Sequence, residues 1–234
     1  MLSPLSSITL WTRCGEGASN ARLEEPLKSF LRAALFEPRL HGKLLNMLSL
    51  LEHIGSRKIM LSQMRKVLDT ELLKHMAEET RHAFFFKHQA ERFCGQPCAD
   101  YEETHTLCAP QARIYFARLD AGITRLLGKN AAPRAPYLWV SFIVELRAGW
   151  FYSFYEQALQ EAKIPLSLKS IMAEEEKHLQ EMQRHLHELG VMNDLLCARV
   201  VTLETKLFTR LLTHLTQAAG ARPPLEQPLH SRAG

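Results

Sequence analysis

The sequence lacks the features that define several large protein classes. No apolar run approaches the roughly 18 residues of a membrane span, and the most apolar stretch, residues 137–144, ends at Glu145. The N-terminal residues have neither a basic start nor an unbroken apolar segment, so they do not predict a signal peptide. No dense Lys/Arg run with interleaved aromatic residues is present and the formal net charge is only +4, which disfavours nucleic-acid binding.

Cysteine is scarce and shows no pairing pattern. The five cysteines are an odd number and are scattered along the chain, which suits a reducing compartment, so we expect a cytoplasmic protein. Cys94, Cys98, His105 and Cys108 are residue types that zinc uses, but their spacing matches no zinc motif. Nearby prolines indicate an ordinary loop, and we assign no ion to these four residues.

Apolar alternation with a period of two, which marks half-buried strands, is nowhere sustained. Apolar residues instead recur at helical spacing in segments that Pro and Gly separate. We predict helices over residues 22–36, 40–60, 69–93, 112–127, 137–162, 167–189 and 193–217. At 234 residues and 46 % hydrophobic content, the chain is expected to form one all-α domain over residues 21–218. Residues 1–20 are expected to be a flexible leader and residues 219–234 a flexible tail.

Within the predicted helices the pattern Glu-x-x-His occurs twice, at Glu79–His82 and at Glu175–His178. On a helix, positions i and i+3 share a face, so each motif aims a carboxylate and an imidazole at one point. Within each of these two runs of glutamates, only Glu79 or Glu175 has a histidine three residues later. We therefore expect their neighbours Glu78, Glu174 and Glu176 to face solvent.

An internal glutamate precedes each motif at a similar distance. Glu52 lies 79 − 52 = 27 positions before Glu79, and Glu145 lies 175 − 145 = 30 positions before Glu175. Two antiparallel helix pairs that share a site at one height would produce such repeated spacing. For the first pair, the midpoint falls close to the predicted turn before Asp69, so both carboxylates return to about the same level.

The second pair fits less well, because the break near Pro165 lies past its midpoint at residue 160. At 1.5 Å per residue, Glu145 would lie ~12 Å from the level of Glu175 unless part of residues 161–169 runs extended. Glu156 competes, since it lies 156 − 145 = 11 positions later on the same helical face. We favour Glu145, because it follows an apolar segment and echoes the first spacing, and Glu156 stays the alternative.

Four carboxylates balance the charge of two divalent cations in a buried site, and oxygen and imidazole ligands suit iron and manganese. Two Glu-x-x-His helices with one further Glu from each of two partners resemble the ferritin-like di-iron carboxylate superfamily, over about residues 40–190. The resemblance implies a ferritin-like four-helix bundle with additional N- and C-terminal helices, holding two Fe ions or an Mn/Fe pair. The implied metal ligands are Glu52, Glu79, His82, Glu145, Glu175 and His178.

Several neighbouring residues bear on the subfamily. Phe86 stands where ribonucleotide reductase small subunits typically carry a radical tyrosine, so this position resembles the oxygenase branches, and Phe86 is a candidate pocket wall. Ferritins usually lack the second full motif, and the paired Cys-x-x-Cys module of rubrerythrins is missing. Tyr152, seven residues after Glu145, is a candidate hydrogen-bond donor to a ligand or a candidate redox residue. His75 shares the face of Glu79 and is a possible extra ligand, and we weigh His185 in the same way.

The resemblance implies an O2-activating oxidase or oxygenase that acts on a small, apolar organic substrate. Its expected partners are that substrate, O2, an electron donor and, in a homodimer, a second copy of the chain. Two alternatives stay open. One is a ferritin- or rubrerythrin-like metal-handling protein, such as a ferroxidase or peroxide scavenger, and the other is a metal-free helical interaction module. The sequence does not indicate the substrate, the donor, the choice of Fe or Mn, or the oligomeric state.

Overall fold

The computed structural model describes residues 17–62 and 70–221, so most of the predicted leader, Asp69 and most of the tail lie outside the described residues. Within the described ranges the chain forms seven α-helices and no strand, which confirms the all-α prediction. The helices are α2 (Gly17–Phe36), α3 (Pro38–Ser62), α4 (Thr70–Cys94), α5 (Ala109–Leu127), α6 (Ala135–Glu161), α7 (Lys169–Glu188) and α8 (Asp194–Ala218).

Each predicted helix is present, with ends shifted by a few residues. Helix α2 begins at Gly17, so residues 17–20 of the predicted leader are helical. Helix α5 begins at Ala109, earlier than predicted, because Pro110 is tolerated in a first turn, where no backbone N–H is needed. Asn193 caps α8, and its side chain accepts a hydrogen bond from the Leu196 backbone N–H at 3.0 Å.

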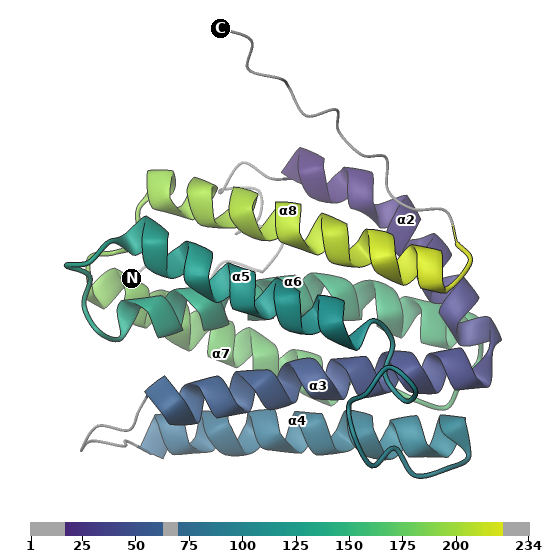
Figure 1. Cartoon of the computed structure of the whole chain (residues 1–234). Coiled ribbons are helices and arrows are strands. Elements are labelled where there is room, and N and C mark those ends of the chain that lie inside the picture. The colour runs from purple at the N-terminus through teal and green to yellow at the C-terminus, as the bar shows by residue number, and fades with distance from the viewer. Residues whose placement is uncertain (1–16, 63–69, 222–234) are drawn as a thin grey trace, which may run out of the picture.

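The helices form a set of four, α3, α4, α6 and α7, and a set of three, α2, α5 and α8, which packs beside it (Figure 1). Helices α3 and α4 pack along each other as one pair, and α6 and α7 pack as a second pair. Helix α8 packs against α5 and α2, and both of these also contact α3 and α6. The four helices that carry the predicted ligands therefore lie together, and α2, α5 and α8 cover one side of α3 and α6.

Helix α6 is the centre of the hydrophobic core. It contacts α2, α3, α5, α7 and α8, which explains why its sequence is apolar and aromatic around most of its circumference. Trp139, Phe142 and Tyr155 of this helix are fully buried. Such large side chains contribute most to the burial of apolar surface that drives folding.

A buried ion pair ties α6 to the covering helices. The Arg147 guanidinium on α6 donates to both carboxylate oxygens of Glu204 on α8, at 2.9 and 2.7 Å. Tyr115 on α5 donates to the same carboxylate at 2.9 Å, and Arg147 also donates to Asn20 of α2 at 3.0 Å. Charges this deep are tolerated because each has a charged or polar partner, so this network fixes how α2, α5 and α8 sit on α6.

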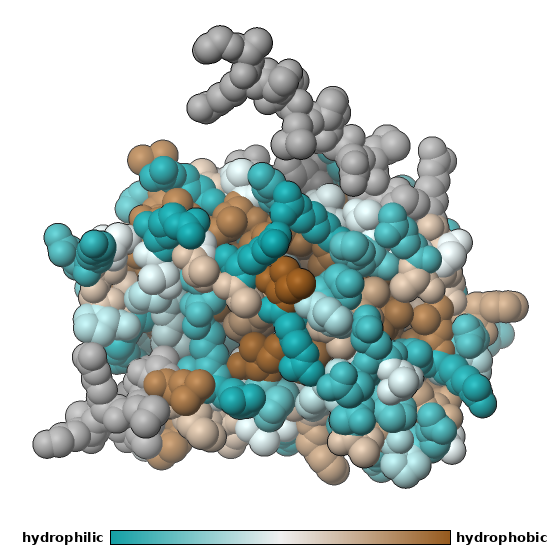
Figure 2. Space-filling model, viewed as in Figure 1, coloured by the Kyte–Doolittle hydropathy of each residue, from teal (hydrophilic) through white to brown (hydrophobic). Residues whose placement is uncertain are grey.

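Hydrophilic residues are widespread on the face shown in Figure 2, and the apolar residues form small separate groups among them. Individual exposed apolar residues of this kind are normal for folded proteins. Among the described helices, none combines the length and the apolar composition that crossing a membrane requires.

Candidate metal centre

Seven buried histidine and glutamate side chains converge between α3, α4, α6 and α7. The structure brings together all six predicted ligands and the possible extra ligand His75. They are between 0 and 9 % exposed, so the cluster is shielded from solvent. The residues are Glu52 of α3, His75, Glu79 and His82 of α4, Glu145 of α6, and Glu175 and His178 of α7.

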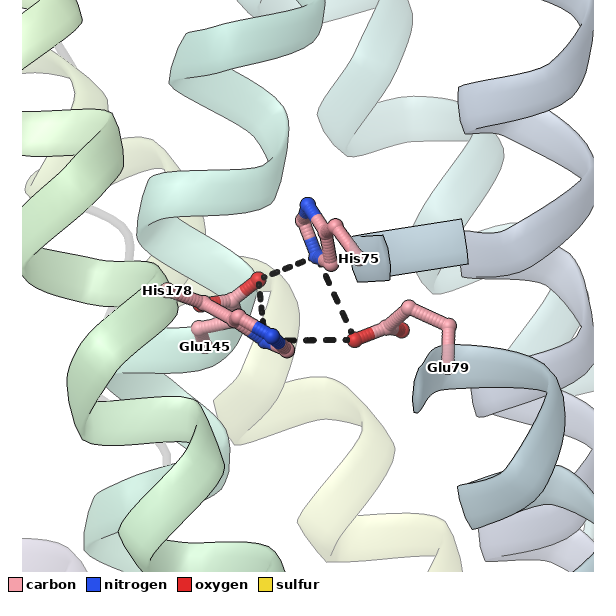
Figure 3. A group of neighbouring side chains, drawn as sticks. All are labelled: His75, Glu79, Glu145 and His178. Carbon is pink, nitrogen blue, oxygen red and sulfur yellow. Dashed lines mark ion pairs between the residues drawn. The ribbon is translucent and has the colours of Figure 1, made fainter. Parts of the chain in front are cut away.

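One group contains two imidazoles and two carboxylates. In Figure 3, His75 and Glu79 extend from α4 towards Glu145 of α6 and His178 of α7. His75 Nε2 lies 3.2 Å from Glu145 Oε1 and 3.4 Å from Glu79 Oε1. His178 Nδ1 lies 3.7 Å from Glu79 Oε1 and 3.9 Å from Glu145 Oε1. The four side chains thus offer two nitrogen and two oxygen atoms around one point.

The second group contains one imidazole and three carboxylates. Glu52, Glu79, His82 and Glu175 each offer an atom within 4.8 Å of the others. His82 Nδ1 lies 3.0 Å from Glu175 Oε1, while Glu175 Oε2 reaches within 3.4 Å of His178 Nδ1 in the first group. Glu79 belongs to both groups, so two ions bound here would share it as a bridging ligand.

The spacing of the donor atoms fits metal ions. Around an ion with bonds of about 2.1 Å, neighbouring ligand atoms lie about 3.0 Å apart in octahedral geometry and about 3.4 Å apart in tetrahedral geometry. The separations stated above, 3.0 to 3.9 Å, are equal to these values or up to about half an ångström longer, and within each group all the ligand atoms lie within 4.8 Å of one another. Six buried atoms of the cluster also have no hydrogen-bond partner within the described part of the chain, and such atoms are costly unless something binds them. They are His75 Nε2, His82 Nδ1, His178 Nδ1, Glu79 Oε1, Glu145 Oε2 and Glu175 Oε2.

Without cations, protons offset the negative charge of the cluster. Burial by itself lowers the pKa of His82, but Glu175 and Glu52 beside it raise this pKa to about 10. For His178, Glu175 and Glu145 likewise overcome the effect of burial and raise the pKa to about 9. Burial and the neighbouring carboxylates raise the pKa of Glu52 and Glu145 well above the ordinary value. The site therefore favours positive charge, which divalent cations supply.

Two outer carboxylates hold the ligand histidines in a reciprocal arrangement. His82 Nε2 on α4 donates to Glu174 on α7 at 2.8 Å, and His178 Nε2 on α7 donates to Glu78 on α4 at 2.9 Å. Arg81 pairs with Glu174, and Lys74 with Glu78 at 3.6 Å. With Nε2–H engaged outwards, Nδ1 of each ring is left to face the cluster, as in carboxylate–histidine–metal arrangements.

The expectation that Glu78 and Glu174 face solvent was therefore wrong. Both side chains are largely buried, with 17 and 22 % exposure, because each crosses to the histidine of the opposite helix. A signal was present in the sequence: both motifs read Glu-Glu-x-x-His, so the same extra glutamate precedes each ligand glutamate. Helical spacing within one segment does not reveal a contact between two helices.

Tyr152 contacts the cluster directly, and Phe86 packs against Tyr152. The Tyr152 hydroxyl donates to Glu52 Oε1 at 2.5 Å, so this tyrosine fixes one ligand carboxylate. Burial, and then Glu52 beside it, raise the pKa of Tyr152 well above the ordinary value, so the hydroxyl keeps its proton. Phe86 is fully buried against the Tyr152 ring, with centroids 5.7 Å apart, and is not part of the cavity wall described below.

Glu145 lies in the cluster and Glu156 does not, because of the path of the connection between α6 and α7. After α6 the chain reverses at Lys163, which has a φ of 54°, and residues 164–168 are not helical. This segment runs back along α6, where Glu156 accepts hydrogen bonds from the Leu168 backbone N–H at 2.7 Å and from Ser167 at 3.2 Å. Glu156 therefore anchors the start of α7, and the extended connection lets Glu145 reach the cluster.

An apolar cavity of ≈ 80 Å³ adjoins the carboxylate side of the cluster. Glu52, Glu79, Glu145 and Glu175 line one end of it, and the remaining wall is predominantly apolar. Because α5 and α8 form part of its wall, sequence motifs on the ligand helices gave no signal for it. Apolar wall residues include Met47, Leu48 and Leu51 of α3, Phe116 of α5, Phe151 of α6, and Phe208 and Leu211 of α8.

The remaining sequence candidates lie away from this cluster. His105 Nδ1 pairs with Asp100 at 2.9 Å, and within residues 17–62 and 70–221 no metal-like group contains Cys94, Cys98 or Cys108. His185 lies near Glu71 and Glu188, at 3.5 and 3.2 Å, and is not in either ligand group.

The comparisons with known proteins add no family to this picture. No protein-family model, no curated protein and no solved structure matches the chain.

Proposed function

We propose that this protein is an O2-activating di-metal carboxylate oxidase or oxygenase of the ferritin-like type. It would bind two Fe ions, or an Mn/Fe pair, and oxidise a small apolar organic substrate. The observation that carries the proposal is one buried cluster in which two ligand groups share Glu79 and six donor atoms lack hydrogen-bond partners within the described residues. Oxygen and imidazole donors in this proportion suit iron and manganese.

The bound metal pair would pass electrons from a reductant to O2 and would offer the open coordination positions that O2 activation requires. The protein supplies the geometry. Glu78 and Glu174 orient the two imidazoles, and Tyr152 orients Glu52. The buried site excludes water and so limits competing reactions.

An oxygenase reaction of this kind requires a reductant besides the substrate and O2. A substrate C–H bond and O2, together with two electrons and two protons, give an alcohol and one water molecule. The two electrons would come from an external reductant, which is the electron donor that the proposal requires. The buried hydroxyl of Tyr152 places one proton beside Glu52.

The apolar cavity supports an organic substrate over metal storage or ferroxidase activity. A ferroxidase has no use for an apolar cavity at its cluster, whereas such a cavity suits O2 and hydrocarbon. The volume of ≈ 80 Å³ is below the roughly 150 Å³ that accommodates benzene in an engineered cavity. We therefore propose a slender aliphatic substrate, or the end of one, over a bulky ring.

Metal analysis tests the proposal directly. The purified chain should contain about two Fe or Mn ions. Glu79→Ala should remove both ions because Glu79 is common to both groups, and His178→Ala and Glu145→Ala should each lower the metal content. Glu156→Ala is the matched control. It should keep the metal and cost about 1 kcal/mol of stability, because it removes only the carboxylate that holds the start of α7.

The outcomes separate the three classes of function. Metal loading that survives Glu79→Ala and His178→Ala would show that the ligand set is wrong. A wild-type chain without metal would leave the metal-free helical module. Two bound ions with rapid Fe²⁺ or peroxide turnover, and no O2-dependent oxidation of any aliphatic compound, would indicate a metal-handling protein.

A further inference from the structure

The cluster has a second opening, whose wall is more polar than that of the apolar cavity, although Leu72, Leu138 and Met182 also line it. A small pocket of ≈ 30 Å³ lies between α4, α6 and α7, and His75 and His178 form its inner wall. Its outer wall carries Glu71, Arg134, Glu181 and His185. This volume has room for about one water-sized species. We call this pocket the polar mouth.

His75 separates the polar mouth from the cluster. Its Nδ1 lies 3.4 Å from the Tyr137 hydroxyl, which also lines the mouth, and its Nε2 faces Glu79 and Glu145 on the cluster side. The His75 and His178 rings lie with centroids 4.1 Å apart. Both imidazoles thus line the pocket and also contact the inner carboxylates.

We propose that metal ions reach the cluster through the polar mouth, with Glu181, Glu71 and His185 as the first groups to bind them. This inference rests on the proposed function, because it requires that the cluster hold metal. The apolar cavity is a poor route for an ion, since removing a cation from water without polar partners is very costly. Substrate and O2 would use that cavity, so ions and organic molecules approach the cluster from different sides.

The outer groups of the mouth form a loose arrangement that an ion can reorganise. His185 Nε2 lies 3.5 Å from Glu71 Oε1, and Arg184 pairs with the same carboxylate at 3.0 Å. Arg134 adds a second positive charge to the wall. Because Glu71 and Arg184 are largely exposed, their ion pair is weak and gives way easily.

Kinetics of metal uptake test the proposal. The chelator-treated full chain is mixed with Co²⁺, and uptake is followed by visible absorption, with the final metal content measured by elemental analysis. His185→Ala and Glu181→Lys should slow uptake by about tenfold, since they remove a coordinating group or reverse a charge that attracts cations. Both variants should still reach the wild-type metal content, because neither residue belongs to a ligand group.

Three control variants are matched to this test. His187→Ala removes an exposed histidine of the same helix, and Glu161→Lys reverses an exposed charge at the end of α6, and both should load at the wild-type rate. Ala148→Phe fills the apolar cavity and should also leave uptake unchanged.

The results distinguish the two proposals. Wild-type uptake rates in His185→Ala and Glu181→Lys, or slow uptake in Ala148→Phe, would overturn the proposed route. A lower final metal content in His185→Ala would make His185 a ligand, and would also overturn it. If the wild-type chain takes up no Co²⁺, the proposed function itself fails.

Discussion

At the residue scale, the cluster depends on side chains that never face its centre. Glu78 and Glu174 hold the outer nitrogens of His178 and His82, each across the space between α4 and α7. Their hydrogen bonds fix the ring orientation and leave Nδ1 free for an ion. In known metal sites, loss of such an outer partner weakens metal binding although every ligand remains.

We therefore expect Glu78→Gln and Glu174→Gln to lower metal affinity by about 10- to 100-fold. The amide keeps the size of the side chain but loses the negative charge that makes the imidazole a stronger ligand. Competition with a chelator of known affinity measures the change.

Glu176→Gln is the matched control for this pair. Glu176 belongs to the run Glu174–Glu176, but its side chain accepts a hydrogen bond from Gln180 on its own helix. Its substitution should leave affinity unchanged. Equal affinities in all three variants would mean that the outer carboxylates do not tune the site.

At the element scale, close contact between α3 and α4 places Glu52 opposite Glu79 and His82. Gly42 makes part of this contact possible, because a Cβ atom there would lie 2.4 Å from Cys94 Sγ and 3.0 Å from the Ala90 carbonyl oxygen. The second is a backbone atom, which cannot move without shifting α4. The two helices therefore need a residue without a side chain at this crossing.

We expect Gly42→Ala to lower the free energy of unfolding by about 1–3 kcal/mol, the usual cost of overpacking. Urea denaturation measures it. Gly149→Ala on α6 is the control, since a Cβ atom there meets nothing within 4 Å. It should stabilise the protein by about 0.5–1 kcal/mol through helix propensity. A neutral or stabilising Gly42→Ala would mean that α3 and α4 separate without cost.

At the scale of the whole molecule, metal binding and folding are coupled through the buried cluster. In the metal-free protein the pKa values of His82 and His178 are raised to about 10 and about 9, above the roughly 6.5 of an unfolded chain. Their contribution to stability is therefore fully present below pH of about 6.5, and it is lost as pH rises through about 9 to 10. The raised pKa values of Glu52 and Glu145 act in the same direction.

Metal binding has the opposite pH dependence, because the ligands must lose their protons first. We therefore expect the difference in Tm between the metal-loaded and the metal-free protein to grow from pH 6 to pH 9. Scanning calorimetry of both forms at several pH values checks this. A difference that stays constant or shrinks with rising pH would show that protons and metal do not compete at these residues.

Much of the molecule could be predicted from local sequence patterns. Helical periodicity places residues three or four apart on one face, so the seven helices and the two Glu-x-x-His motifs follow from spacing alone. The same rule aligned His75 with Glu79 on α4. These features depend only on residues within one segment of the chain. The sequence by itself therefore determined them.

Only the tertiary structure decided the features that depend on contacts between segments. The path of residues 162–168 brings Glu145 into the cluster and leaves Glu156 at the start of α7. The crossing of Glu78 and Glu174 joins residues about a hundred positions apart. The apolar cavity needs α5 and α8, which carry none of the ligands. Such features follow from how helices pack, because spacing along one helix does not specify which side chain of another helix it will meet.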